Sequence, residues 1–309
     1  MPTFTTPLDN ATLTYHHYTA TSPSPSKPPL TLILLHGWPM SSRMFDPILP
    51  SLLAPSSPFT TLILPDRRGF GDSSSSWSTP LTTHPVTFTT FVSDLVSLIA
   101  HLNPGPFVFL AASMGCADSL HAYSSDEYIQ QNCKGFIWIG PNMPYPVRCE
   151  ECPNGVDPAI WEGLVAGMSS PRRVEFIHEQ IPGVFRTDIE GNELSETTLR
   201  FYEGLVLGAD PVAVQETVSI ICEGGKVEGK LKALVERRER GEEVPGVLIL
   251  HGSEDVGMPV EVSGGLVKGM LEWAVLRVYE GAGHGLYQTH AERVVRDVLE
   301  FVQSVPGRA

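Results

Sequence analysis

The feature that most constrains this chain is an alternation of short apolar runs with amphipathic stretches. The apolar runs are continuous and rich in β-branched and aromatic residues: Leu30–Leu35, Leu62–Leu64, Phe107–Leu110, Phe136–Ile139, Val247–Leu250 and Val275–Tyr279. Such runs are typical of strands buried on both faces of a parallel sheet. The amphipathic stretches between them predict helices: Met44–Leu53, Phe88–Leu102, Cys116–Tyr123 and His290–Val302. The order strand, helix, strand, helix predicts an α/β fold with a mostly parallel, doubly wound sheet.

Three other regions carry different patterns. Near the N-terminus, Thr3–Thr6 and Thr12–Tyr18 alternate apolar with polar residues, which predicts a hairpin at a sheet edge. Ser22–Pro29 is a low-complexity stretch of Ser and Pro, expected to be an exposed loop. Residues 146–246 contain no clear strand and are too long for a simple connection. We therefore expect an inserted helical lid at 146–246 and a core domain formed by residues 1–145 and 247–309.

The charge balance excludes several classes of partner. The 309 residues include 35 acidic and 21 basic side chains, a formal net charge of −14. A chain this acidic is repelled by nucleic acids and by anionic membranes, so neither is expected as a partner. The N-terminus lacks the basic start and apolar core of a signal peptide. With five cysteines, an odd count that fits reduced thiols, the expected location is the cytoplasm.

One pair of cysteines has metal-ligand spacing. Cys149 and Cys152 are separated by two residues, as in half of a structural zinc site or in a redox pair. No second pair with suitable spacing follows, and the motif lies among prolines rather than at the start of a helix. We therefore expect no metal and no cofactor.

Three residues suited to acyl-transfer chemistry follow three of the predicted strands. Ser113 comes directly after the run that ends near Leu110, Asp255 follows Val247–Leu250, and His284 follows Val275–Tyr279. Because ligands of open α/β sheets bind at the carboxyl ends of the strands, these side chains are expected at one edge. A serine hydroxyl becomes a nucleophile when an imidazole takes its proton, and a carboxylate orients that imidazole.

Each of these residues also has a structural alternative. Ser113 is placed to cap a helix N-terminus, and Asp255 to hold a turn, with Glu254 beside it as the other acid. His284 lies between glycines on a strand-end loop, which argues against a core histidine. Structural roles are expected for five further polar residues near the strand ends: His36, Asp66, Arg67, Arg68 and His251.

Together the motifs resemble the α/β-hydrolase superfamily from about Leu30 to Val302. The motifs are His36-Gly37-Trp38-Pro39, Asp66-Arg67-Arg68-Gly69-Phe70-Gly71-Asp72-Ser73, Ser113-Met114-Gly115 and Tyr279-Glu280-Gly281 leading into Gly283-His284-Gly285. They are most similar to the cofactor-free haloperoxidase (perhydrolase) and esterase branch. The chain order serine, aspartate, histidine is also that of hydrolases with a nucleophile elbow. Ala111 departs from the pattern, since a glycine often stands there.

The resemblance implies a role for particular residues. Ser113 would be the nucleophile, Asp255 the acid and His284 the base, with the backbone amides of Trp38 and Met114 as oxyanion donors. The expected reaction is hydrolysis of a small or medium apolar ester, lactone or related acyl compound through an acyl-enzyme. Alternatives are perhydrolysis, a lyase, cyclisation or C–C cleavage step with the same triad, and a ligand-binding receptor built on a hydrolase fold. The sequence leaves the oligomeric state open.

Overall fold

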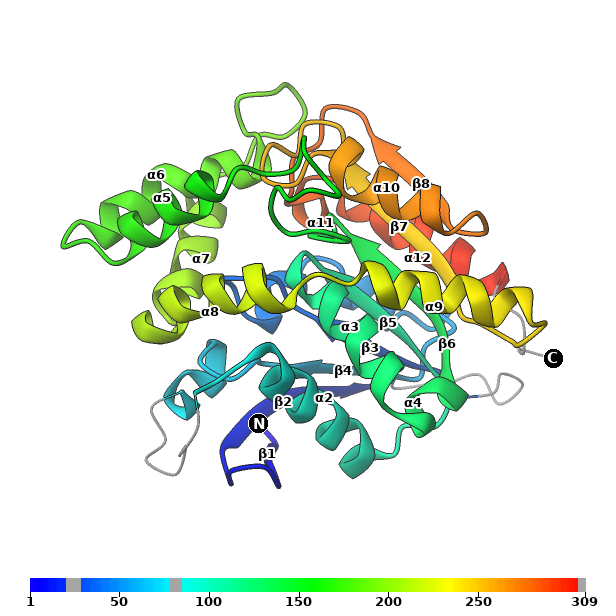
Figure 1. Cartoon of the computed structure of the whole chain (residues 1–309). Helices are drawn as coiled ribbons and strands as arrows, with labels where there is room; N and C mark the ends of the chain where they lie inside the picture. The colour runs from blue at the N-terminus through cyan, green and yellow to red at the C-terminus, as the bar shows by residue number, and fades with distance from the viewer. Residues whose placement is uncertain (21–28, 78–84, 305–309) are drawn as a thin grey trace.

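The fold is built on one eight-stranded sheet, seen in a computed structural model that describes residues 1–20, 29–77 and 85–304 (Figure 1). The strand order is β1-β2-β4-β3-β5-β6-β7-β8. The bounds are β1 Thr3–Thr5, β2 Thr12–Thr19, β3 Thr31–Leu35, β4 Thr61–Pro65, β5 Phe107–Ala112, β6 Cys133–Ile139, β7 Gly246–Gly252 and β8 Val275–Tyr279. β1 and β2 form an antiparallel hairpin, β2 is antiparallel to β4, and β3 to β8 are parallel. The predicted α/β class and mostly parallel sheet are confirmed; most of the predicted loop Ser22–Pro29 lies outside the described residues.

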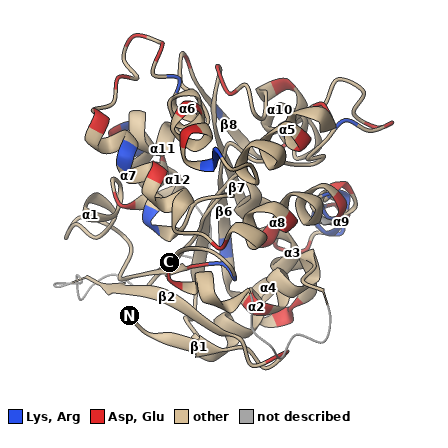
Figure 2. Ribbon diagram, turned by 90° about the vertical axis from the view of Figure 1, so that its left-hand side faces the viewer, with Lys and Arg blue, Asp and Glu red and all other residues tan. Residues whose placement is uncertain are grey.

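Alternate residues of the central strands enter two separate cores, one on each face of the sheet. Phe107, Phe109 and Ala111 of β5 pack on the face covered by α2 (Phe88–Leu102) and α3 (Met114–Ser125). Val108 and Leu110 pack on the opposite face, against α1 (Leu49–Leu52) and α12 (Ala291–Ser304). Because side chains alternate along a strand, burial on both faces requires the unbroken apolar runs seen in the sequence. Figure 2 places most of the acidic and basic residues on helices and loops instead.

One predicted helix is interrupted. The stretch Met44–Leu53 contains a 3-10 helix, η1 (Ser42–Phe45), and the separate short helix α1. Pro47 explains the break, because proline has no backbone N–H with which to continue the hydrogen bonds of a helix. The other predicted helices coincide with α2, α3 and α12 to within two residues.

Residues 146–246 are helical, as the missing strand pattern predicts. They contain α5 Pro158–Met168, α6 Arg173–Phe185, α7 Glu196–Leu207, α8 Pro211–Gly224 and α9 Glu228–Glu239. Figure 1 places α5, α6 and α7 beyond one end of the strands, whereas α9 runs beside α3. Leu231 and Leu234 of α9 belong to the same core as α2 and α3, and α9 also contacts α10 (Gly264–Met270). The division into two domains stays a prediction, and the packing of α9 favours an insertion that ends near Val227.

No single helix among the described residues combines the length and apolarity needed to cross a bilayer. α7 and α8 meet that test only when taken together, as a pair bent by 83°.

Candidate active site

Ser113 occupies a sharp turn between β5 and α3. Its backbone has φ 52° and ψ −121°, and the residue is only 8% exposed. A non-glycine residue in this region costs about 1–3 kcal/mol and is found mainly at functional sites. Its side chain makes no capping hydrogen bond to α3. The conformation is therefore that of a serine held out at the head of a helix, rather than that of a helix cap.

Small neighbours allow this turn to pack closely. A Cβ atom added to Gly115 would lie 2.5 Å from the carbonyl oxygen of Leu35, inside van der Waals contact. One added to Gly37 would lie 3.0 Å from the Cβ of Ser113. Ala111 is fully buried in the sheet and pairs with Leu35 and Trp138 in its neighbouring strands. The departure from glycine at position 111 is thus accommodated within β5.

Asp255 and His284 form a buried acid–imidazole pair. The Nδ1 of His284 lies 2.6 Å from the Oδ2 of Asp255. The Oδ1 of Asp255 accepts hydrogen bonds from the amides of Gly257 at 3.1 Å and Met258 at 2.9 Å. Burial disfavours an ionised Asp255, but the charge of His284 and the hydrogen bonds from His251 and His284 lower its pKa overall. Since the ionised carboxylate accepts from Nδ1, the Nε2 of His284 is left available for a second partner.

The same pair sets the protonation of His284. Desolvation of the imidazole opposes its protonation, but the charge of Asp255 and the hydrogen bond that His284 donates to it raise the pKa of His284 overall. The His284 side chain remains 24% exposed, so it is the more open member of the pair. The arrangement is that of a base oriented by a buried acid.

Glu254, the alternative acid, is engaged elsewhere. Its carboxylate Oε2 lies 3.3 Å from the Nη1 of Arg186, and its side chain is 45% exposed. Arg186 also pairs with Asp188 at 3.0 Å. Among the described residues, Asp255 is therefore the carboxylate that contacts His284.

The end of β6 lies between Ser113 and the Asp255–His284 pair. The sequence did not predict this link. The amide of Ser113 donates to the carbonyl of Ile139 at 2.9 Å. The next residue, Gly140, has φ +50°, and a Cβ atom there would lie 3.0 Å from the Nδ1 of His284 and 3.2 Å from the Oδ2 of Asp255. Ser113 thus adjoins Ile139, the last residue of β6, and the Asp255–His284 pair adjoins Gly140, the residue that follows it. The sequence feature that could have indicated this link is the glycine at the end of a predicted strand.

The two predicted oxyanion donors lie near this turn. Met114 is the first residue of α3 and is fully buried, so its amide belongs to a helix N-terminus, where backbone N–H groups favour negative charge. Trp38 follows Gly37, the residue that packs against Ser113. The Trp38 indole donates to the carbonyl of Val214 in α8 at 3.0 Å, and its ring lies 5.8 Å from that of Trp161 in α5.

His36 stabilises the loop that contains Trp38 through two hydrogen bonds. Its Nε2 accepts from the amide of Arg67 at 2.9 Å, and its Nδ1 therefore donates to the carbonyl of Gly37 at 3.0 Å. Burial and the nearby charge of Arg67 hold the pKa of His36 well below its usual value, which favours this neutral tautomer. The role is structural.

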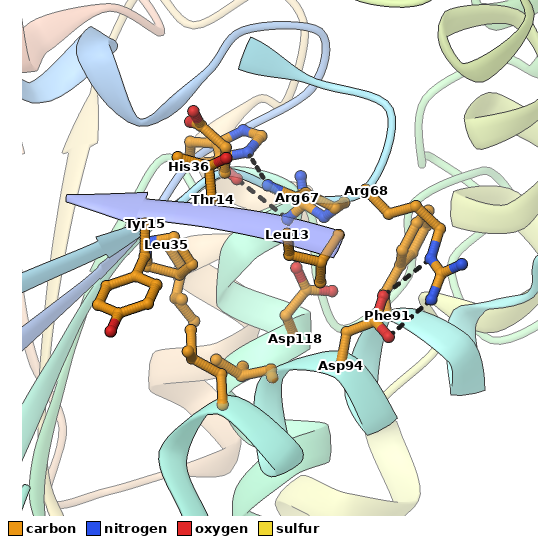
Figure 3. A pocket seen from close by; sticks show the side chains of 14 residues that line it. Leu13, Thr14, Tyr15, Leu35, His36, Arg67, Arg68, Phe91, Asp94 and Asp118 are labelled. Atoms are coloured by element: carbon orange, nitrogen blue, oxygen red, sulfur yellow. Dashed lines mark hydrogen bonds and ion pairs between the residues drawn. The ribbon is translucent and has the colours of Figure 1, made fainter. Parts of the chain in front are cut away.

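Beside His36 lies a cavity of about 40 Å³ lined by ion pairs (Figure 3). Arg67 pairs with Asp118, and Arg68 with Asp94 at 2.9 Å and Asp9 at 2.5 Å. Arg68 is fully buried, and its partners come from the β1–β2 turn and from α2. The expected bracing by Arg67 and Arg68 is confirmed. Neither Ser113 nor the Asp255–His284 pair lines this cavity.

Helices of the 146–246 segment meet the site on two sides. On one side, α5 and α8 supply the contacts to Trp38. On the other, the amide of Gly285 donates to the carbonyl of Val184 in α6 at 2.9 Å, and a Cβ atom on Gly285 would lie 2.2 Å from the ring of Phe185. Phe185 itself is fully buried, so this aromatic residue packs rather than lines an open surface.

The metal-ligand candidates lie elsewhere. Cys149 and Cys152 are free thiols on a tight turn, where each amide donates to the other residue's carbonyl at 3.2–3.3 Å. Within the described ranges, the side chains spaced to hold a metal ion do not include them; they are His16, Asp66 and Asp72. His251 is fully buried behind the acid, with Nε2 2.7 Å from the carbonyl of Met258 and 3.4 Å from the Oδ2 of Asp255, as a structural role requires.

Known proteins share both the sequence pattern and this architecture. The chain is 26% identical over 272 residues to a bifunctional esterase/perhydrolase of Acinetobacter calcoaceticus, covering 87% of this chain and 90% of that protein. It is 24% identical to a non-heme chloroperoxidase of Kitasatospora aureofaciens, covering 88% and 91%. The crystal structure of a bromoperoxidase from Bacillus anthracis superposes with a TM-score of 0.81 at 24% identity, over 98% of this chain and 100% of that one.

An esterase from Exiguobacterium antarcticum has the same fold, with a TM-score of 0.80 at 20% identity over 98% and 99% of the two chains. The sequence model of the alpha/beta hydrolase family matches residues 32–297, which include every strand of the parallel part of the sheet and all the candidate site residues. With a match over this length, the chain belongs to the alpha/beta hydrolase family.

Proposed function

We propose that this protein is a serine hydrolase that cleaves a small or medium apolar ester, lactone or related acyl compound through an acyl-enzyme on Ser113. One observation carries the proposal. Ser113 stands in a strained turn at the head of α3, and the end of β6 connects it to a buried Asp255–His284 pair. A hydroxyl, a base and an orienting acid are what nucleophilic acyl transfer requires.

The reaction follows from these positions. The Oγ of Ser113 attacks the acyl carbonyl while the Nε2 of His284 takes its proton. The amides of Trp38 and Met114 stabilise the tetrahedral oxyanion, and Asp255 stabilises the charged imidazole. Collapse breaks the ester bond, and His284 returns the proton to the leaving alcohol. Water, activated by His284, then attacks the acyl-enzyme and releases the carboxylic acid.

Perhydrolysis is the second candidate, and the relatives favour it over the remaining alternatives. One similar protein is named an esterase/perhydrolase, and others are non-heme haloperoxidases. In this reaction hydrogen peroxide attacks the acyl-enzyme in place of water and leaves as a peracid, with Ser113 restored. A lyase, cyclisation or C–C cleavage step would use the same residues, whereas a receptor without turnover would need neither the base nor its acid.

A pre-steady-state measurement with p-nitrophenyl acetate tests the proposal. The wild-type protein should release a burst of p-nitrophenol close to one equivalent of enzyme when deacylation is slower than acylation. Ser113→Ala should release no burst. Adding hydrogen peroxide and assaying peracid separates the two candidate reactions, because only the perhydrolase forms it. Equal turnover by Ser113→Ala and wild type would contradict both.

A further inference from the structure

We propose that His16, Asp66 and Asp72 form a binding site for a divalent transition-metal ion such as Zn²⁺. His16 lies on β2, Asp66 directly follows β4, and Asp72 belongs to the 3-10 helix η2 (Gly71–Ser76). One nitrogen or oxygen ligand atom from each lies within 4.8 Å of the others. Imidazole and carboxylate groups are the ordinary protein ligands of zinc.

His16 has an imidazole nitrogen that lacks a hydrogen-bond partner. Its side chain is only 10% exposed, and its Nε2 makes no hydrogen bond within the described part of the chain. The nearest charged atom recorded for this nitrogen is the Oδ2 of Asp72, 3.7 Å away and beyond hydrogen-bond distance. Buried polar atoms usually have a partner, so an unpartnered nitrogen beside two carboxylates points to a missing cation.

Two backbone hydrogen bonds fix the Asp66 carboxylate and leave some of its acceptor positions unused. Its Oδ1 accepts from the amide of Ser42 at 2.8 Å, and its Oδ2 accepts from the amide of Asp72 at 2.9 Å. A carboxylate has about four acceptor positions, so two remain. Gly71, with φ +52°, passes so close that a Cβ atom would lie 2.4 Å from Oδ2. This close approach brings Asp72 beside Asp66.

The charge of the cluster is not balanced by nearby basic side chains. Within the described residues, neither Asp66 nor Asp72 forms an ion pair with a lysine or arginine. Arg43 interacts electrostatically with Asp72, but its guanidinium forms an ion pair with Asp46 at 2.6 Å. Asp72 is 47% exposed, which gives an ion a route from solvent. A divalent cation would neutralise both carboxylates and fill the vacant coordination of His16.

The spacing also suits the ion. Ligands about 2.0–2.2 Å from zinc in a tetrahedral site lie about 3.3–3.5 Å from one another. The 3.7 Å between His16 and Asp72 is close to that separation, and since the three ligand atoms lie within 4.8 Å of one another, an ion would draw them closer together. Imidazole suits zinc and carboxylates suit manganese, whereas the lack of a thiolate disfavours Cu(I). Three protein ligands leave one position for water.

This proposal departs from the sequence-based expectation of no metal. The three ligands come from different elements, and their separations in sequence form no recognisable ligand motif. Asp66 also fixes the start of η1 through Ser42, so an ion would join β2, the end of β4 and η1.

The test is calorimetric titration of EDTA-treated protein with Zn²⁺, with matched histidine and aspartate controls. His16→Gln and Asp72→Asn remove one ligand each. His17→Gln changes the exposed neighbouring residue of β2, and Asp188→Asn an exposed aspartate that pairs with Arg186, outside the cluster. Loss of a ligand should weaken Zn²⁺ binding at least about tenfold, as losses in the outer shell alone do. Both controls should bind as wild type does, and Zn²⁺ should raise the melting temperature of wild type and controls only.

Asp72→Asn keeps the test decisive if His16→Gln does not fold, because Asp72 lies at the surface. Three results would overturn the proposal: no stoichiometric Zn²⁺ binding by the wild-type protein, unchanged affinity in Asp72→Asn, or unchanged affinity in a folded His16→Gln. The first result would leave His16 and Asp72 as an ion pair only. The others would assign the zinc to another position, such as the Cys149–Cys152 turn.

Discussion

Two adjacent carboxylates, Glu254 and Asp255, have different environments and should have different effects on turnover. Asp255 is buried and contacts His284, whereas Glu254 pairs with Arg186. We expect Asp255→Asn to lower kcat for an activated ester by about 10⁴, the loss seen when the orienting aspartate of a serine protease is changed. Glu254→Gln should lower it by less than about tenfold, because it removes a half-exposed ion pair. The opposite ranking would make Glu254 the acid.

The protonation of His284 predicts the pH dependence. A base must be neutral, and the charge of Asp255 raises the pKa of His284 above the usual value of 6.5. kcat/KM should therefore fall as the pH decreases through that raised pKa. In Asp255→Asn the residual activity should fall at a lower pH, because the charge that favours protonation is gone. Profiles of kcat/KM against pH for both proteins check this; an acidic limb that stays in place would show that Asp255 does not act on His284.

At the level of single residues, the sequence indicated which residues lie at the sheet edge better than what surrounds each of them. Ser113, Asp255 and His284 follow their strands in an order with a recognisable meaning, and the structure brings Asp255 and His284 into contact. The conformation of Ser113, the pairing of Glu254 with Arg186 and the contact of Gly140 with His284 depend on segments that meet only after folding. Pattern and spacing carry no information about such contacts.

At the scale of the elements, the junction of β3, β5 and α3 is sensitive to added volume. Gly115→Ala would place a methyl group 2.5 Å from the Leu35 carbonyl and push α3 away from β3. We expect a loss of stability on the order of 1–3 kcal/mol together with reduced turnover, because α3 carries the Met114 amide.

Gly163→Ala is the matched control, since no heavy atom lies within 4 Å of its added Cβ in α5. It should leave stability unchanged or raise it slightly, because alanine favours helix over glycine. Thermal unfolding and ester turnover of both variants measure the difference. Equal stability and turnover in Gly115→Ala and wild type would contradict the claim that the turn at Ser113 needs the close packing of Gly115 against Leu35.

The elements themselves were largely predictable, and the exception has a local cause. Apolar runs mark β3 to β7 because both sheet faces are covered there, β8 at the edge contains Arg277 and is less buried, and three of the predicted helices are present. The fourth is divided at Pro47, where the absence of a backbone N–H outweighs the amphipathic pattern. The arrangement of α5 to α9 was not predicted, since their sequences indicate helix but not which surface each helix meets.

On the scale of the whole molecule, helices of the 146–246 segment and the sheet edge together form the surroundings of Ser113. Trp161 of α5 packs against Trp38, the residue that would supply an oxyanion amide. Trp161→Ala should therefore change the ratio of kcat/KM for a bulky ester to that for a short one by several-fold, with the short ester less affected.

Trp273→Ala serves as the control for removing an indole, because Trp273 packs between Arg238 and Pro245, where it has no recorded contact with Trp38. It should leave the ratio as in the wild-type protein. An unchanged ratio in Trp161→Ala would mean that α5 does not determine specificity, and selectivity would then have to come from the strand-end loops.

The most direct test of the central claim, that Ser113 is the nucleophile, is peptide mapping by mass spectrometry after labelling with a fluorophosphonate. The account predicts a single phosphonyl adduct on the peptide containing Ser113, one equivalent per chain, and none in Ser113→Ala. It also predicts slow labelling in Asp255→Asn and near-normal labelling in Glu254→Gln. A stoichiometric adduct on any other residue, or full labelling of a folded Ser113→Ala, would contradict it.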